Sequence, residues 1–145
     1  MTLELTLGGR AGFWAQGGIL WVRIIGLALY VPSAILVFGS VIQLHRKGKV
    51  EGSIALSAYG TSVVVDSGVF RLVRHPLWLG TIIWSIALML VFQSVFSIVL
   101  GAVAINLFRL TAIKETEFNI GKFGDPYREY IKKVPMWNVF KGLRK

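Results

Sequence analysis

Two long uncharged stretches dominate the pattern of hydrophobic and polar residues. The first, from Ile24 to Leu44, holds about 21 residues without a charge, close to the roughly 20 that cross a bilayer as a helix. Only Arg23 separates it from further apolar residues. We therefore predict a first membrane span over about 19–44, with Pro32 inside it, since membrane helices tolerate proline better than soluble ones.

The second stretch, Leu77 to Phe108, is about 32 residues long and would measure about 48 Å as one helix, too long for a simple span. We predict two spans, over about 77–92 and 95–113, that form a tight hairpin turning at Gln93-Ser94. One long tilted helix is the alternative. Small residues that would let the hairpin helices approach closely are Ser97, Gly101 and Ala104.

Composition and charge agree with a membrane protein. Apolar residues make up 54% of the chain and charged residues 16%, which excludes intrinsic disorder. All but Arg10 and Arg23 of the 16 basic residues fall on the side of the central loop, 45–76, and the tail, 114–145. By the positive-inside rule this side is cytoplasmic, so the net charge of +9 needs no nucleic acid partner. We expect one all-α integral membrane domain over 1–145, with three transmembrane helices.

Two basic side chains precede the hairpin at its cytoplasmic end. Arg74 and His75 stand directly before Pro76, which fits the first residue of a helix because its missing N–H costs nothing there. Two donor side chains beside free helix N–H groups favour an anion such as a carboxylate or phosphate. The alternative is an ordinary interfacial anchor.

Two acidic side chains follow the hairpin. Glu115 and Glu117 are among only 7 acidic residues in the chain, and they lie where the last span would leave the membrane. The alternative is that the two are surface carboxylates that pair locally with Arg109 or Lys114. The chain has no cysteine and only 2 histidines, so no metal site is predicted.

An amphipathic helix is predicted in the tail. Asp125 is expected to cap it and Pro126 to occupy its first turn. Its apolar face comprises Tyr127, Tyr130, Ile131 and Val134. We expect this helix to lie on the membrane surface or to pack over the central loop, with the tyrosines as packing residues. Trp78 and Trp84 are also interpreted as packing aromatics.

Four blocks of the sequence carry a family resemblance. Residues 67–80 read S-G-V-F-R-L-V-R-H-P-L-W-L-G, and after the hairpin come E-T-E-F at 115–118, F-G-D-P-Y-R-E-Y at 123–130 and V-P at 134–135. In this order they resemble the signatures of the isoprenylcysteine carboxyl methyltransferase and phospholipid methyltransferase superfamily. The chain departs from the pattern at Trp78, where tyrosine is usual, and at Thr116, which interrupts an acidic pair.

This resemblance implies a membrane methyltransferase that uses S-adenosyl-L-methionine. The cofactor would lie between the hairpin and the tail, and a lipophilic acceptor, an isoprenylcysteine-type carboxylate or a phospholipid amine, would enter from the bilayer. Arg74, His75 and Glu115 are implied as the catalytic residues. The implied cofactor contacts are Arg74, His75, Pro76, Gly80, Glu115, Glu117, Phe123 and Tyr127. The expected location is the cell membrane of a prokaryote or the endoplasmic reticulum of a eukaryote.

Two other functions remain open. Membrane sterol reductases share an R-H-P-x-Y block but use NADPH, and Glu115 and Glu117 would repel its additional phosphate. A non-catalytic membrane adaptor is the second alternative, because Trp78 and Thr116 depart from the enzyme pattern.

Overall fold

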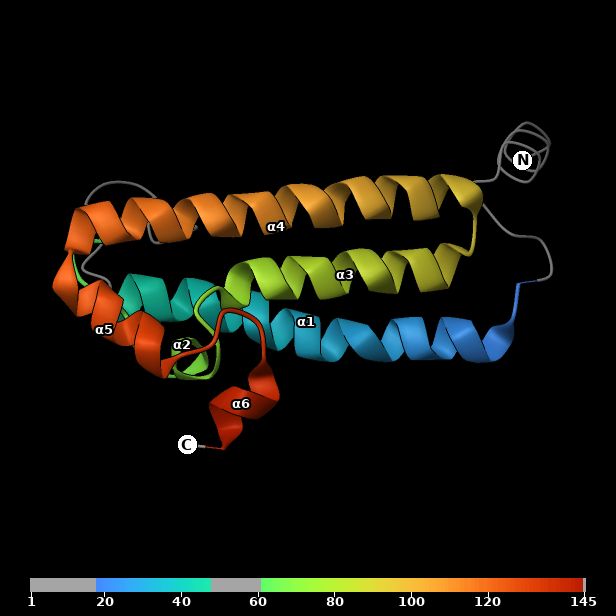
Figure 1. The fold of residues 1–145 in the computed structure, drawn as a ribbon. Coiled ribbons are helices and arrows are strands. Elements are labelled where there is room, and N and C mark those ends of the chain that lie inside the picture. The colour runs from blue at the N-terminus through green and yellow to red at the C-terminus, as the bar shows by residue number, and fades with distance from the viewer. Residues whose placement is uncertain (1–17, 48–60, 145) are drawn as a thin grey trace.

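The regular structure is helical throughout the part of the chain that the computed structural model describes, residues 18–47 and 61–144 (Figure 1). The three long helices are α1 (Leu20–Lys47), α3 (Pro76–Phe92) and α4 (Val95–Phe123). They run side by side, with α3 between α1 and α4 (Figure 1). Three short helices gather at one end of this bundle: α2 (Val69–Leu72), α5 (Asp125–Lys133) and α6 (Val139–Leu143).

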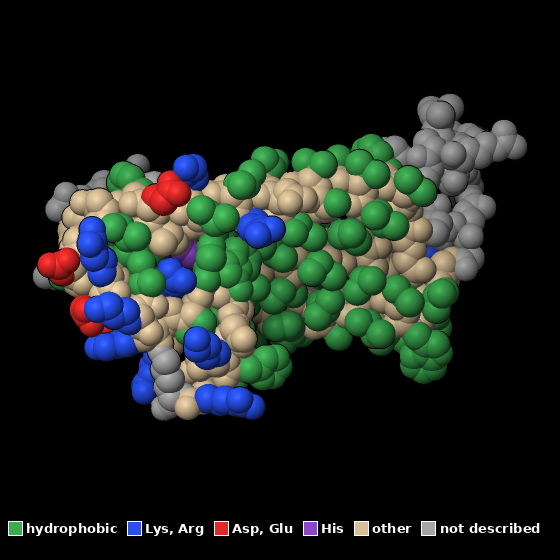
Figure 2. Space-filling model, in the orientation of Figure 1, with side chains coloured by type: hydrophobic (Ala, Val, Ile, Leu, Met, Phe, Trp, Pro, Cys, Tyr) green, Lys and Arg blue, Asp and Glu red, His purple; other side chains and the backbone are tan. Residues whose placement is uncertain are grey.

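The helices α1 and α4 are long and apolar enough to cross a membrane. Only 22% of the most apolar window of α1 and 11% of that of α4 are buried. Core helices of soluble proteins hide such surface, whereas these two turn it outward. Figure 2 shows hydrophobic side chains along the bundle and basic side chains at the end formed by α5 and α6.

The second apolar stretch is divided at the polar pair Gln93-Ser94, where the break was predicted. Gln93 adopts a left-handed backbone conformation with φ of 48° and ends α3. Ser94 begins α4 with a reciprocal cap, in which the Ser94 and Ser97 side chains each accept a hydrogen bond from the other residue's backbone N–H. The start of α3 at Pro76 was also predicted correctly.

Helix α4 continues beyond the predicted span end at residue 113, as far as Phe123. The helix ends where Gly124 adopts φ of 64°, a conformation that glycine accepts most readily. Glu115, Thr116 and Asn119 therefore belong to α4 and not to the tail that was predicted to begin at residue 114.

The amphipathic tail helix is present as α5, and it packs over the loop and the end of α4. Tyr127, Tyr130 and Val134 are buried, and they pack against partly buried hydrophobic side chains that include Val64, Ile120 and Phe123. The prediction of its cap was wrong by one residue: Gly124 occupies the N-cap position and Asp125 is the first helical residue. The single helical turn α2 was not predicted either.

Two hydrogen bonds hold the tail to the segment before α3. The Tyr130 hydroxyl donates to the Phe70 carbonyl at 2.6 Å. The Arg74 backbone N–H donates to the Pro135 carbonyl at 3.0 Å. The two sequence blocks on either side of the α3–α4 pair are thus joined directly.

Candidate functional site

His75 connects the start of α3 to the C-terminal part of α4. Its Nε2 lies 2.6 Å from the Thr116 hydroxyl oxygen, and its Nδ1 lies 3.9 Å from Glu115 Oε2. The indole N–H of Trp78, in the first turn of α3, donates a hydrogen bond to the same carboxylate oxygen. Residues about 40 positions apart in the sequence therefore meet in one polar cluster.

The hydrogen bonds of Thr116 assign the proton on His75. The Thr116 hydroxyl donates its single proton to the Ala112 carbonyl at 3.0 Å, so it accepts from His75 Nε2–H. Burial, together with the nearby positive charge of Arg74, lowers the pKa of His75 from 6.5 to about 3. His75 is therefore neutral at physiological pH, with the lone pair of Nδ1 on the side of Glu115.

The carboxyl group of Glu115 is enclosed, with the residue only 4% exposed. A buried carboxylate is stable only when donors or positive charges satisfy it. The Trp78 indole supplies one donor. The ring of Trp78 also stacks on Phe108 of α4, with centroids 5.9 Å apart, so Trp78 closes the polar cluster on its apolar side.

Two further polar atoms next to this cluster are buried without a hydrogen-bond partner in the described structure. They are Arg74 Nε, a donor, and Asn119 Oδ1, an acceptor. A buried polar atom without a partner costs about 1–3 kcal/mol, so native structures rarely keep one without a reason. Such a pair is suited to a ligand that carries both an acceptor and a donor.

Two small cavities border these atoms. One of about 20 Å³ is lined in part by Arg74, Asn119, Phe123 and Tyr127. The other, of about 10 Å³, is lined in part by Arg74, His75, Trp78 and Glu115. Arg74 lies between the two. Burial raises the pKa of Tyr127, so its hydroxyl stays protonated and able to donate.

Comparison with known proteins identifies the family. The family model described as phospholipid methyltransferase matches residues 21–125, which include α2, α3, nearly all of α1 and all of α4. The chain belongs to the phospholipid methyltransferase family. With its two long helices of outward-facing apolar surface, this family member is a membrane protein.

Curated relatives of this family member carry the name protein-S-isoprenylcysteine O-methyltransferase. The protein of Xenopus laevis is 30% identical over 132 residues, which cover 87% of this chain and 44% of the relative. That of Dictyostelium discoideum is 23% identical over 128 residues, covering 79% and 49%. The chain thus spans about half the length of these relatives. No solved structure matches it.

The structure brings most of the predicted site residues of this family member together. Those that line the two cavities are Arg74, His75, Pro76, Glu115, Phe123 and Tyr127. Two lie elsewhere. The side chain of Glu117 is 58% exposed and pairs with Lys114 at 2.8 Å, the local ion pair that helical spacing allowed. Gly80 faces α1, where an added Cβ would stand 2.7 Å from Val37 Cγ2.

Sequence reasoning missed three residues of the cluster: Trp78, Thr116 and Asn119. Trp78 was interpreted as a packing aromatic, and it does stack on Phe108, but its N–H also binds Glu115. Thr116 was interpreted as an interruption, yet it holds His75. A usable signal existed for Asn119, which lies four residues after Glu115 and so on the same helix face.

Proposed function

We propose that this chain transfers a methyl group from S-adenosylmethionine to a lipophilic acceptor at the cytosolic face of a membrane. The acceptor would be an isoprenylcysteine-type carboxylate or a phospholipid amine. The family match and the names of the relatives support methyl transfer. The observation that carries the proposal is the convergence of Arg74, His75 and Glu115 around one buried polar centre.

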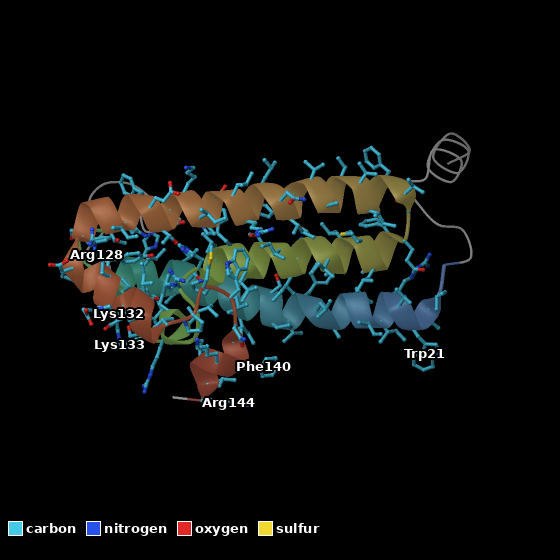
Figure 3. The ribbon with its side chains drawn as sticks, in the orientation of Figure 1. Trp21, Arg128, Lys132, Lys133, Phe140 and Arg144 are labelled. Carbon is cyan, nitrogen blue, oxygen red and sulfur yellow. The ribbon has the colours of Figure 1, made fainter. Side chains whose placement is uncertain are left out.

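The proposed topology has three spans, α1, α3 and α4, with α3 and α4 as a membrane hairpin. The basic residues of the tail support this orientation, because Arg128, Lys132, Lys133 and Arg144 lie at the same end of the bundle as the polar cluster (Figure 3). Under the positive-inside rule this end would face the cytosol.

The donor set fits the methionine portion of the cofactor. Arg74, with its unpartnered Nε, would bind the carboxylate. Glu115 would bind the ammonium group or the ribose hydroxyls, and Phe123 and Tyr127 would cover the adenine. The acidic contact is assigned to Glu115 alone, because Glu117 is exposed and paired with Lys114.

The cofactor would enter only after the site opens. The two cavities of about 20 and 10 Å³ are far below the roughly 300 Å³ of a small-molecule pocket. The backbone at Gly124 joins α4 to α5, and no atom lies within 4 Å of the position of a Cβ there. Rotation at this glycine would lift α5, with Tyr127, away from α4.

The residues of the chain would act mainly by positioning. The cofactor supplies a methyl group on a positively charged sulfur, which is already a good leaving group. Orienting two reactants lowers a barrier by as much as about 7–11 kcal/mol. A carboxylate acceptor needs no base. For an amine acceptor, Glu115 would accept the proton, because a pKa of about 3 makes His75 too weak a base.

Calorimetric titration of the detergent-purified protein with S-adenosylhomocysteine tests the proposal. We expect the wild type to bind, and Arg74→Ala and Glu115→Gln each to weaken binding roughly tenfold to hundredfold, because each removes a charged hydrogen bond. The matched controls are Arg71→Ala and Glu117→Gln. Each removes the same kind of charge close in sequence to a site residue, but from an exposed side chain. Unchanged affinity in both site variants would refute the assignment.

Two further measurements separate this function from its alternatives. Thermal stabilisation by NADPH and not by S-adenosylhomocysteine would favour a reductase. Binding of S-adenosylhomocysteine, with no transfer of labelled methyl from the cofactor to a membrane lipid extract, would favour a non-catalytic protein. Mass spectrometry of that extract identifies the acceptor as the species that gains one methyl group.

A further inference from the structure

Helix α6 carries an apolar face that no other described part of the chain covers. Phe140 is 79% exposed and Leu143 62% exposed. The two residues are three positions apart and so share one side of the helix. Neighbouring large hydrophobic side chains that are this exposed indicate a surface that binds a membrane or another protein.

The orientation of this face is fixed by the opposite side of α6. Gly142 is buried, and a Cβ added to it would stand 2.1 Å from the Leu72 carbonyl oxygen, so only glycine permits this contact with α2. The Asn138 side chain caps the helix by accepting a hydrogen bond from the Lys141 N–H at 3.0 Å. Phe140 and Leu143 therefore point away from the protein as a consequence of packing.

Basic side chains border the apolar pair. Lys141 and Arg144 are both exposed, and no acidic residue follows Glu129 in the sequence. In Figure 3 the Phe140 ring projects from α6 toward the side on which the long helices extend. Figure 2 shows the hydrophobic surface of the bundle beginning beside α6 and basic side chains around it.

We propose that α6 is an interfacial anchor that binds the surface of a bilayer containing anionic lipids. Phe140 and Leu143 enter the boundary between headgroups and acyl chains, and Lys141 and Arg144 bind headgroup phosphates. This combination of an apolar face with flanking basic residues is what interfacial helices use. A bilayer is favoured over a protein partner because the apolar face is continuous with the outward-facing apolar surface of the long helices.

The anchor acts on the polar cluster through two contacts. Gly142 rests on the Leu72 carbonyl, two residues before Arg74. Arg74 in turn donates its N–H to Pro135, which precedes α6. Membrane binding by α6 thus sets the depth of this segment relative to the bilayer. The inference does not depend on methyl transfer.

The absence of cysteine from the chain permits a direct test with single-cysteine variants. Leu143→Cys and, separately, Phe140→Cys are labelled with a polarity-sensitive fluorophore. The full chain is reconstituted in vesicles of phosphatidylcholine, alone or mixed with phosphatidylglycerol. Quenching by lipids that carry a nitroxide near the headgroup reports immersion. Lys132→Cys, on an exposed position of α5, is the matched control.

We expect strong quenching at positions 140 and 143 in the mixed vesicles and little at position 132. The double substitution of Lys141 and Arg144 by glutamine should lower the ratio of immersed to exposed label by about fivefold per charge removed. High salt should act in the same direction. Gly142 is left intact in these variants, so the contact with α2 is retained.

Three results would overturn the proposal. The first is quenching at 140 and 143 no stronger than at 132 in the mixed vesicles. The second is equal quenching in both vesicle types that is also insensitive to the loss of Lys141 and Arg144. The third is burial of the label only after a soluble protein is added, which would make the partner of α6 a protein.

Discussion

The two interfaces that α3 makes with its neighbours are built differently. Against α1, backbones approach closely at small residues. The Ser33 hydroxyl donates to the Gly80 carbonyl at 2.8 Å, and a Cβ on Gly26 would stand 3.0 Å from the Ala87 carbonyl. Small residues at such contacts are the usual way in which membrane helices pack tightly.

Against α4, the same helix leaves an apolar cavity of about 300 Å³. Residues from both helices line it, among them Ser85 and Leu88 of α3 and Gly101 and Ala104 of α4. Toward the turn, α4 is tied to α3 by the short connection at Gln93-Ser94. At the other end the ties are the contacts of Trp78 with Glu115 and Phe108, and the hydrogen bond between His75 and Thr116.

The two interfaces of α3 therefore differ in how tightly they are packed. The α1–α3 pair holds Pro76 and the segment before it in place. The α3–α4 pair leaves its cavity in the half that lies toward the Gln93-Ser94 turn. Under the proposed function, this cavity would receive the hydrocarbon part of a lipophilic acceptor from the bilayer. The predictions below probe each side of this comparison.

Overpacking the tight interface should have the largest effect. Gly80→Val places carbon atoms where Val37 Cγ2 is 2.7 Å and the Ser33 carbonyl 3.1 Å from the Cβ. We expect a loss of about 3 kcal/mol in the free energy of unfolding, measured in detergent, because a backbone carbonyl cannot move aside.

The control for this substitution is Gly121→Ala in α4. No atom lies within 4 Å of its Cβ position, so the change should stabilise the helix by up to about 1 kcal/mol. A Gly80→Val protein as stable as the wild type would contradict the tight packing of α1 on α3.

Removing the indole N–H of Trp78 should lower the free energy of unfolding by less than Gly80→Val does. Trp78→Phe deletes the donor to Glu115 and leaves a buried carboxylate with one hydrogen bond fewer. We expect a loss of about 2 kcal/mol in unfolding free energy, together with weaker binding of S-adenosylhomocysteine. Trp78→Tyr restores a donor and should recover part of both losses. Equal effects of Phe and Tyr would show that only the ring matters.

Low pH should reduce the stability of the folded protein, because His75 is buried in its neutral form. Its pKa is about 3 in the folded protein and 6.5 in the unfolded chain. The unfolded chain therefore binds a proton that the folded protein excludes, and stability falls as pH drops below 6.5 toward 3 and is unaffected above that range. Between pH 7 and 5.5 the loss should be about 1 kcal/mol.

Thermal unfolding across this pH range measures the effect. In His75→Gln the dependence should disappear, whereas His45→Gln should keep it, because His45 is exposed at the end of α1. The same pH dependence in wild type and His75→Gln would assign the titration to another group.

The sequence predicts those features that depend on local chemistry. Pro76 and the pair Gln93-Ser94 mark helix ends because proline and a capping serine act on their own backbone neighbourhood. The choice between Glu115 and Glu117 is of another kind. Two positions apart on a helix, they point in nearly opposite directions, so only one can face α3, and the helix rotation that decides this is set by tertiary packing.

The contact between Trp78 and Glu115 escapes prediction for the same reason. It depends on the register between α3 and α4, and periodicity within each helix carries no information about that register. Gly80 shows the reverse case. It lies in the family motif, so a role in cofactor binding was predicted, yet its lack of a side chain is required by α1.

The smallest effect is expected at the loose interface. In Gly101→Ala the new Cβ would stand 2.4 Å from Met89 Sδ, which is closer than any atom would be to a Cβ at Gly80. The obstacle here is a flexible side chain next to an apolar cavity, so Met89 can move aside, and alanine improves helix propensity. We expect a change in unfolding free energy below about 1 kcal/mol. If Gly101→Ala destabilises the protein as much as Gly80→Val, the α3–α4 interface is as rigid as the α1–α3 interface, and entry of an acceptor between α3 and α4 loses its structural basis.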